Sequence, residues 1–307
     1  MQSARGVGAE ARSLSIQSIL YETDPESALR VARSAALAAA SAVSAGVLSN
    51  WELAFGDSSA TPMLDDPTIR AIDETIAQAG GRFRYEFFGS NLGHGGGHNQ
   101  LATAASTDLM LFVNPDALLG PDTLVRLASA VVDTVGVADA RQVPLEHPKD
   151  YTAAGGDASW SAGACMMTPR TVFETVRGFD SATFFMYCDD VDYSWRVRLA
   201  GFRSIYVPAA RVFHDKRMSA TATYVAGEVE TYYSAEAALL LAYKYSNPRL
   251  VRSLIREFRR YGTEPALRAV GEFRARRSAG SLPVRIDADH RVAQFVGPNY
   301  GPVRFSG

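Results

Sequence analysis

The segment Leu109–Val113 constrains the fold most strongly, because its five residues are all apolar and the polar run Asn114-Pro115-Asp116 follows at once. A short, wholly apolar strand is typical of a parallel sheet that is covered on both faces. Strand and helix signals alternate along the chain before this segment. This alternation predicts βαβ units and a doubly wound, parallel α/β sheet.

The alternating elements are predicted from apolar periodicity and from capping residues. Helices begin where Asp precedes or meets Pro, because Asp caps a helix and Pro fits its first turn. A further helix, from about His98 to Ser106, follows a glycine loop. The expected strands are Leu14–Tyr21, Trp51–Phe55 and 83–87, and the expected helix starts are Asp24-Pro25 and Asp66-Pro67.

The second half of the chain is less regular. We expect a helix up to Leu199 with Gly201 as its stop, a strand at Ser204–Val207, and a strand-like run Arg211-Val212-Phe213. From Val225 onward the pattern is mainly helical. Residues 1–13 are expected to form a flexible N-terminus, because the first dozen are small and polar.

Composition excludes several classes of protein. Lys and Arg number 31 against 33 Asp and Glu, a net charge of −2, which does not fit a nucleic-acid-coating protein. Two cysteines exclude a disulfide scaffold and suit a reducing cytoplasm. The longest uncharged stretch, between Arg33 and Glu52, is mostly Ala and Ser. Because these residues are weakly apolar, we expect a soluble helix there and no membrane span.

Polar residues stand where the predicted strands end. Asp57, the Asn91–Gly97 loop and Asp116 all follow strands, and ligands of open α/β sheets bind beyond the carboxyl ends of the strands. A carboxylate at such a place is a natural ligand for Mg²⁺ or Mn²⁺ shared with phosphate. The alternative is a plain turn, since Asn, Pro and Asp all favour turns.

The glycine loop could let the backbone approach a phosphate at the start of a helix. The dinucleotide fingerprint fails, because His98 stands where its third glycine would fall. His94 and His98 have the spacing of a metal-binding pair, but a glycine loop would not fix two imidazoles. A flexible loop without a ligand is the alternative.

Three carboxylates, Asp189, Asp190 and Asp192, begin the helix that ends at Leu199. They repel one another, so stability alone does not favour them, and an ionised carboxylate near a hydroxyl is a candidate general base. Helix capping with Arg196 or Arg198 as partner is the alternative. His214 gains weight only in combination with Asp116, and Cys165 is expected to be an inert apolar residue.

The order of these motifs resembles the family 2 glycosyltransferases. It runs from Asp57 through Asn91-x-Gly93, Asn99 and Asn114-Pro115-Asp116 to Gly178-Phe179-Asp180, Tyr187–Arg196 and His214. The sequence is most similar to rhamnosyltransferase-like and galactofuranosyltransferase-like members, over about Ser15–Ser219. The resemblance implies a GT-A fold, an α/β architecture with a Rossmann-like, mostly parallel central sheet flanked by helices. It implies a catalytic domain at 14–219, with a nucleotide-sugar half (14–116) and an acceptor half (117–219), and a mainly helical C-terminal region at 220–307.

The resemblance also implies roles for single residues. Asp57 would accept a hydrogen bond from the nucleobase, and the backbone near Tyr21 and Glu22 would line the same pocket. Asp116 and His214 would hold a divalent metal, Mn²⁺ or Mg²⁺. Asp190 would be the catalytic base, with Asp189 and Trp160 on the acceptor side. The remaining contacts to the nucleotide sugar would come from Asn91, Gly93, Asn99, Asn114 and Asp116.

The resulting hypothesis is an inverting, metal-dependent glycosyltransferase of the cytoplasm. It would move a sugar from a UDP- or dTDP-linked donor to a hydroxyl of a glycan, a lipid-linked acceptor or a small molecule, in polysaccharide or natural-product biosynthesis. Two alternatives are a dinucleotide-dependent oxidoreductase and a non-catalytic nucleotide-sugar-binding protein. The broken glycine fingerprint speaks against the first. The second would not need Asp116, His214 and Asp190 together.

The segment Arg249–Arg277 is strongly basic, with nine Arg, no Lys and three Glu. A basic amphipathic helix can lie on an anionic bilayer. This predicts a peripheral contact with the inner face of the membrane, which would suit a lipid-linked acceptor. A solvated face and a homodimer contact are the alternatives.

Overall fold

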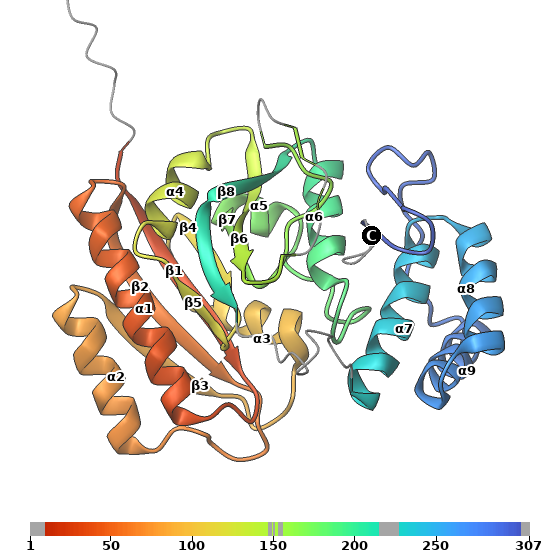
Figure 1. Ribbon diagram of the computed structural model, residues 1–307, viewed down its shortest axis with the longest axis horizontal. Helices are drawn as coiled ribbons and strands as arrows, with labels where there is room; N and C mark the ends of the chain where they lie inside the picture. The colour runs from red at the N-terminus through yellow and green to blue at the C-terminus, as the bar shows by residue number, and fades with distance from the viewer. Residues whose placement is uncertain (1–9, 147–148, 150, 153–155, 215–226, 302–307) are drawn as a thin grey trace, which may run out of the picture.

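The chain folds into a mixed eight-stranded sheet with helices on both faces, and a helical C-terminal part lies beside it (Figure 1). The computed structural model describes residues 10–146, 149, 151–152, 156–214 and 227–301. The strand order is β3-β2-β1-β4-β7-β6-β8-β5. The strands are β1 (Arg12–Leu20), β2 (Leu48–Asp57), β3 (Arg82–Phe87), β4 (Leu109–Val113), β5 (Ala117–Leu119), β6 (Val135–Val143), β7 (Cys165–Pro169) and β8 (Arg203–His214).

The helices alternate with the first strands and then gather at the C-terminus. The α1 helix, rich in alanine, packs its small side chains against the sheet, and Asp24 caps it by accepting a hydrogen bond from Ser27 N. The helices are α1 (Pro25–Ser44), α2 (Asp66–Gln78), α3 (Gly93–Ala102), α4 (Thr123–Ala130), α5 (Arg170–Thr175), α6 (Asp189–Leu199), α7 (Glu228–Lys244), α8 (Pro248–Tyr261) and α9 (Glu264–Ala279).

The first half of the sheet is parallel, as the alternation predicts. Strand β1 lies between β2 and β4 and pairs in parallel with both, and β3 continues the parallel order beyond β2. The second half is mixed, because β7 runs antiparallel to β4 and β6, while β6 and β8 are parallel. The predicted GT-A architecture, a mostly parallel sheet flanked by helices, is confirmed.

The structure corrects three details of the predicted elements. Asp65 rather than Asp66 caps α2, accepting from Thr68 N. The two strand-like pieces at Ser204–Val207 and 211–213 form one strand, β8. Helix α3 begins at Gly93 rather than near His98, so the glycines lie inside a helix and not in a loop.

Close packing explains the glycines of α3. A Cβ on Gly95 would lie 2.8 Å from Phe179 Cβ, and one on Gly97 would lie 2.9 Å from Ile19 Cδ1. Gly93 has a φ of +69°, and a Cβ there would lie 2.3 Å from the Phe185 carbonyl oxygen. The glycines therefore let α3 approach both β1 and the segment before α6, which outweighs their low helix propensity.

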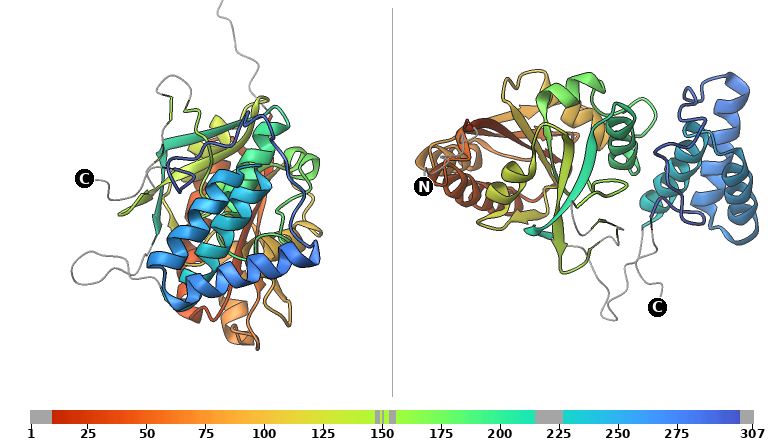
Figure 2. Two further views of the ribbon diagram at one scale, coloured as in Figure 1. Left: turned by 90° about the vertical axis from the view of Figure 1, so that its right-hand side faces the viewer. Right: turned by 90° about the horizontal axis from the view of Figure 1, so that it is seen from above.

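The C-terminal helices share a hydrophobic core with α6. Trp195 and Val191 of α6 pack with Leu239, Leu240 and Leu241 of α7 in one buried cluster. In two further views the three C-terminal helices stand together on the α6 side of the molecule (Figure 2). Within the described part of the chain, none of the helices combines the length and apolarity needed to cross a bilayer. The predicted domain boundary at 219–220 lies outside the described residues.

Candidate active site

The pairing of β5 with β8 brings two predicted metal ligands together. The two strands are antiparallel, and Ala117 lies opposite His214. Asp116 precedes Ala117 in the turn after β4, so its carboxylate falls beside the imidazole. His214 Nε2 lies 3.2 Å from Asp116 Oδ1, and the Asp116 side chain is 49% exposed while that of His214 is 9% exposed.

The surroundings of His214 suit a metal ligand. Its Nδ1 lies 2.8 Å from Gln142 Oε1 on β6, an acceptor, so the proton belongs on Nδ1. The Nε2 lone pair then faces the Asp116 carboxylate, an arrangement that a cation between the two would stabilise. Metal-binding histidines commonly donate their other N–H to an oxygen in this way. The donor set therefore fits Mn²⁺ or Mg²⁺, although within the described ranges no third Asp, Glu, His or Cys joins the pair.

Asn114 lies at the same edge of the sheet. Its Nδ2 lies 3.4 Å from His214 Nε2, and its backbone N–H donates to the Ala164 carbonyl oxygen at 3.1 Å. The side-chain amide therefore borders the candidate metal pair. The backbone bond also connects the pair to the segment before β7.

Asp190 stands at the other end of that segment. Its Oδ2 accepts from Gly163 N at 2.9 Å, and its Oδ1 accepts from Val191 N at 2.8 Å. Burial and the neighbouring Asp189 carboxylate raise the pKa of Asp190 to about 6. A partly exposed carboxylate with such a pKa is a stronger base than an ordinary aspartate and is still ionised near pH 7.

Asp189 and Asp192 are set apart from Asp190 by their partners. Asp189 Oδ2 lies 2.6 Å from His94 Nδ1 on α3. Asp192 is fully buried and contacts Arg196 at 2.7 Å and Lys244 at 2.5 Å. Asp192 is therefore a structural residue, and the acidic cluster divides into one base candidate and two paired carboxylates.

His94 is the residue that the sequence reasoning missed. The glycine run predicts a loop that would not fix an imidazole, whereas α3 is a helix and fixes both His94 and His98. The rings of His94 and His98 lie 4.6 Å apart. His98 is buried against Phe112 and Phe179, and burial lowers its pKa well below 6.5. The i, i+4 spacing of His94 and His98 is the sequence signal that could have pointed to His94. In the structure, however, the partner of His94 is the Asp189 carboxylate and not a metal shared with His98.

Asp57 ends β2 in an enclosed network. Its Oδ1 accepts from Ser59 N at 2.9 Å, and its Oδ2 accepts from Met63 N at 2.8 Å and from the Tyr85 hydroxyl at 2.5 Å. The side chain is fully buried. In this structure the carboxylate fixes the turn after β2, and a nucleobase would have to compete with these three donors.

The other residues predicted to contact the nucleotide sugar lie at the same edge of the sheet, and their side chains differ in exposure. Tyr21 is 51% exposed, and Glu22 donates its N–H to Ser59 Oγ at 2.8 Å. Asn91 Oδ1 accepts from Gly93 N at 3.0 Å at the start of α3. Asn99 clamps α3 to the chain before α6, donating to the Phe179 carbonyl at 2.8 Å and accepting from its N–H at 2.9 Å.

Trp160 and Cys165 lie inside the protein. Trp160 is 3% exposed and makes an edge-to-face contact with Tyr300, with ring centroids 5.0 Å apart. The C-terminal segment thus covers the aromatic side chain that was predicted to face the acceptor. Burial raises the pKa of the Cys165 thiol to about 12, which agrees with an inert residue.

Comparisons with known proteins point to a single family. The model of "Glycosyltransferase like family 2" matches residues 60–228, more than half of the chain. An N-acetylglucosaminyl-diphospho-decaprenol L-rhamnosyltransferase of Mycobacterium tuberculosis is 39% identical over 86 residues, 28% of this chain and 25% of that protein. Rhamnosyltransferase WbbL of Escherichia coli is 28% identical over 39% of this chain and 61% of its own length. The chain thus spans less than two thirds of either relative.

Solved structures share the fold at low sequence identity. Mannosyltransferase PcManGT from Pyrobaculum calidifontis, in complex with GDP-Man and Mn²⁺, matches with a TM-score of 0.54 at 15% identity, covering 86% of this chain and 80% of that one. GalNAc-T7 with UDP, GalNAc and Mn²⁺ matches with a TM-score of 0.57 at 12% identity, covering 90% and 60%. The family model covers more than half of the chain, and the solved structures share its fold. The chain belongs to the glycosyltransferase-like family 2.

Proposed function

We propose that the chain transfers a sugar from a nucleoside-diphosphate sugar to an acceptor hydroxyl and inverts the anomeric carbon. The observation that carries this proposal is the convergence of Asp116 and His214 at one edge of the sheet, connected through residues 162–164 to Asp190. The names of the two relatives support a rhamnosyl group as the transferred sugar. The mycobacterial name supports a lipid-linked diphosphate as the acceptor.

The chain's own residues supply binding and base chemistry. Asp116 and His214 would hold Mn²⁺ or Mg²⁺, and a bound cation supplies positive charge that offsets the charge of the departing diphosphate. The N–H groups of Gly163 and Val191 hold the Asp190 carboxylate in place. Asp190 then takes the proton of the acceptor hydroxyl as its oxygen attacks the sugar carbon. A single attack with a single base inverts that carbon.

The donor is the first thing to measure. We expect UDP- or dTDP-sugars with Mn²⁺ to raise the melting temperature, because a ligand that binds the folded state stabilises it by mass action. NAD should have no effect, because His98 interrupts the dinucleotide fingerprint. Stabilisation by NAD in place of nucleotide sugars would favour the oxidoreductase alternative.

Transfer itself separates an enzyme from a binding protein. Asp190→Asn should lower single-turnover transfer about 10²- to 10⁴-fold, the usual loss on removing a general base, while donor affinity stays near that of the unchanged protein. Asp192→Asn, on the same helix, is the matched control and should keep transfer per folded molecule. Transfer retained in Asp190→Asn would contradict the proposed mechanism.

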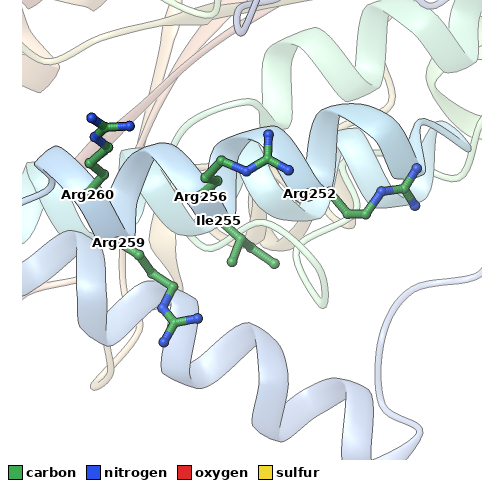
Figure 3. Close-up of a pocket in the computed structure, with 5 residues that line it drawn as sticks. All are labelled: Arg252, Ile255, Arg256, Arg259 and Arg260. Carbon is green, nitrogen blue, oxygen red and sulfur yellow. The ribbon is translucent and has the colours of Figure 1, made fainter.

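Helix α8 supports a further element of the proposal, contact with an anionic membrane. Its buried face is apolar, with Leu250, Val251 and Leu254 turned toward α7 and α9. A hollow lies on this helix, and Figure 3 shows the side chains that line it. The hollow is lined by Ile255 and by Arg252, Arg256, Arg259 and Arg260.

Charge and apolar exposure favour a bilayer as the occupant of this surface. Within the described part of the chain, none of these four guanidinium groups has an ion-pair partner, and Tyr261 beside them is 74% exposed. Each basic side chain near an anionic leaflet contributes about 1 kcal/mol. On this proposal the chain works at the cytoplasmic face of the membrane, next to a lipid-linked acceptor.

Vesicle flotation tests this contact. The protein should float with phosphatidylglycerol vesicles but not with phosphatidylcholine vesicles, and added salt should weaken the binding. Replacing the four arginines of the hollow by Gln should abolish flotation. The charge-matched control removes Arg30, Arg70, Arg82 and Arg126 from the other end of the molecule and should still float. Concentration-dependent dimers that the first variant lacks would instead assign α8 to a homodimer interface.

A further inference from the structure

An ion pair connects α3 to α6 immediately beside the proposed base. His94 Nδ1 lies 2.6 Å from Asp189 Oδ2, and the two side chains are 23% and 5% exposed. Gly95 makes this approach feasible, because a Cβ there would lie 3.3 Å from Asp189 Oδ2 and 2.8 Å from Phe179 Cβ. The pair is therefore built into the packing of the two helices.

The other edge of the His94 ring lies near Asp190. A Cβ on Gly163 would lie 3.1 Å from His94 Cε1 and 3.4 Å from Asp190 Cβ, so the two side chains border the same glycine. Gly163 also donates its N–H to Asp190. No described residue forms a hydrogen bond with His94 Nε2. The imidazole thus contacts Asp189 through Nδ1, and it borders Gly163 together with Asp190.

The charges in this cluster are interdependent. Burial lowers the pKa of His94, but the charge and hydrogen bond of Asp189 and the charge of Asp190 outweigh it, so the pKa is raised above 6.5. Asp190 experiences the opposite influences, since burial and Asp189 raise its pKa while the Gly163 N–H and His94 lower it. Two further titratable groups adjoin the cluster. The lowered pKa of His98 keeps that ring neutral, and burial together with the three aspartates raises the pKa of the Cys188 thiol well above its ordinary value.

We propose that His94 is a positioning residue for transfer, whose imidazolium neutralises Asp189 and leaves Asp190 free to take the acceptor proton. This inference rests on the proposed function. Without the imidazolium, Asp190 would face the uncompensated charge of its neighbour and would hold its own proton to higher pH. His94 therefore extends the working range of the base toward acid.

The acid limb of the pH profile of single-turnover transfer tests the inference. In the unchanged protein this limb should lie near pH 6, the pKa of Asp190. His94→Gln can still donate to Asp189 but lacks the charge. We expect it to move the limb up by about one pH unit, since nearby charges shift carboxyl pKa values by about 1–3 units. Transfer near pH 6 then falls about fivefold, and the deficit shrinks toward pH 8.5.

Two further variants show the direction of the effect. Asp189→Asn should move the limb down, because it removes the repelling charge, and the double variant with His94→Gln should lie close to Asp189→Asn. His98→Gln is the matched control on the same helix and should leave the limb in place. A merely structural role for His94 would lower transfer at every pH without moving the limb, and this outcome would overturn the inference.

A direct measurement separates this inference from the proposed function. The NMR titration of the His94 ring should show a pKa above 6.5 that falls in Asp189→Asn. If the pKa of the His94 ring is the same in Asp189→Asn as in the unchanged protein, the pair does not form. If the His94 pKa falls in Asp189→Asn but the acid limb of transfer does not move in His94→Gln, the pair forms but has no influence on Asp190. Retained transfer in Asp190→Asn would overturn the base assignment itself, and the titration would be unaffected.

Discussion

Replacing Asp190 with Asn should stabilise the protein above neutral pH, although the same change should lower transfer if Asp190 is the base. The folded structure raises the pKa of this carboxyl from 3.8 to about 6. At about 1.36 kcal/mol per pKa unit, the ionised carboxylate then costs the folded state about 3 kcal/mol. The variant loses one of the bonds from Gly163 N and Val191 N, which costs about 1 kcal/mol. The net gain is about 2 kcal/mol, or about 3 °C in melting temperature for a chain of this size.

The pH dependence identifies the cause. A carboxyl whose pKa is raised on folding binds its proton more tightly in the folded state, so its destabilising effect grows from about pH 4 to pH 6 and is complete above that range. Scanning calorimetry at pH 8 should show the higher melting temperature of Asp190→Asn. At pH 4 the gain should vanish, because Asp190 is then protonated in the folded protein. A variant less stable than the unchanged protein at pH 8, or equally stabilised at both pH values, would refute the reasoning.

Three further predictions concern the metal pair, the C-terminal helices and the thiols. Asp116→Asn and His214→Gln should remove the Mn²⁺-dependent part of donor stabilisation in a thermal-shift assay, and EDTA should do the same to the unchanged protein; activity indifferent to EDTA would contradict the metal assignment. In a denaturant titration, Lys244→Met should lower the free energy of unfolding by about 3 kcal/mol, because it leaves Asp180 and Asp192 without their shared partner. The control Arg268→Met, at the exposed pair with Glu264, should lower it by less than about 1 kcal/mol. Cys165, buried and with its pKa raised to about 12, should resist iodoacetamide at pH 8 until the protein unfolds, and rapid alkylation of the folded protein would contradict that burial.

The parallel half of the fold was predictable because apolar periodicity determines it. Leu109–Val113 is a fully buried strand, and Asp116 stands at its carboxyl end as expected. The register that places Asp116 against His214 was not predictable, since it depends on β5 pairing with a strand about a hundred residues away. The sequence pattern suggested the two residues through the family resemblance, and tertiary structure brings them together.

The glycine run forms a helix instead of the predicted loop for a physical reason. Glycine disfavours helices in isolation, but at Gly95 and Gly97 close contacts with Phe179 and Ile19 select a residue without a side chain. Tertiary packing therefore overrode local propensity. For the same reason the role of His94 was not predictable from local sequence, since its partner Asp189 lies 95 residues further along the chain.

The bond between Lys244 and Asp192 has a consequence for any shortened form of this protein. Lys244 is the last residue of α7. Its ammonium group and the Tyr245 hydroxyl both contact the carboxylate of Asp192 on α6. A chain cut before α7 would expose the apolar face of α6 to water and would leave Asp192 with Arg196 as the remaining one of its two cationic partners. The C-terminal helices therefore help to keep α6, which carries the proposed base, in its folded position. We expect their removal to disturb that helix as well as to remove the basic surface.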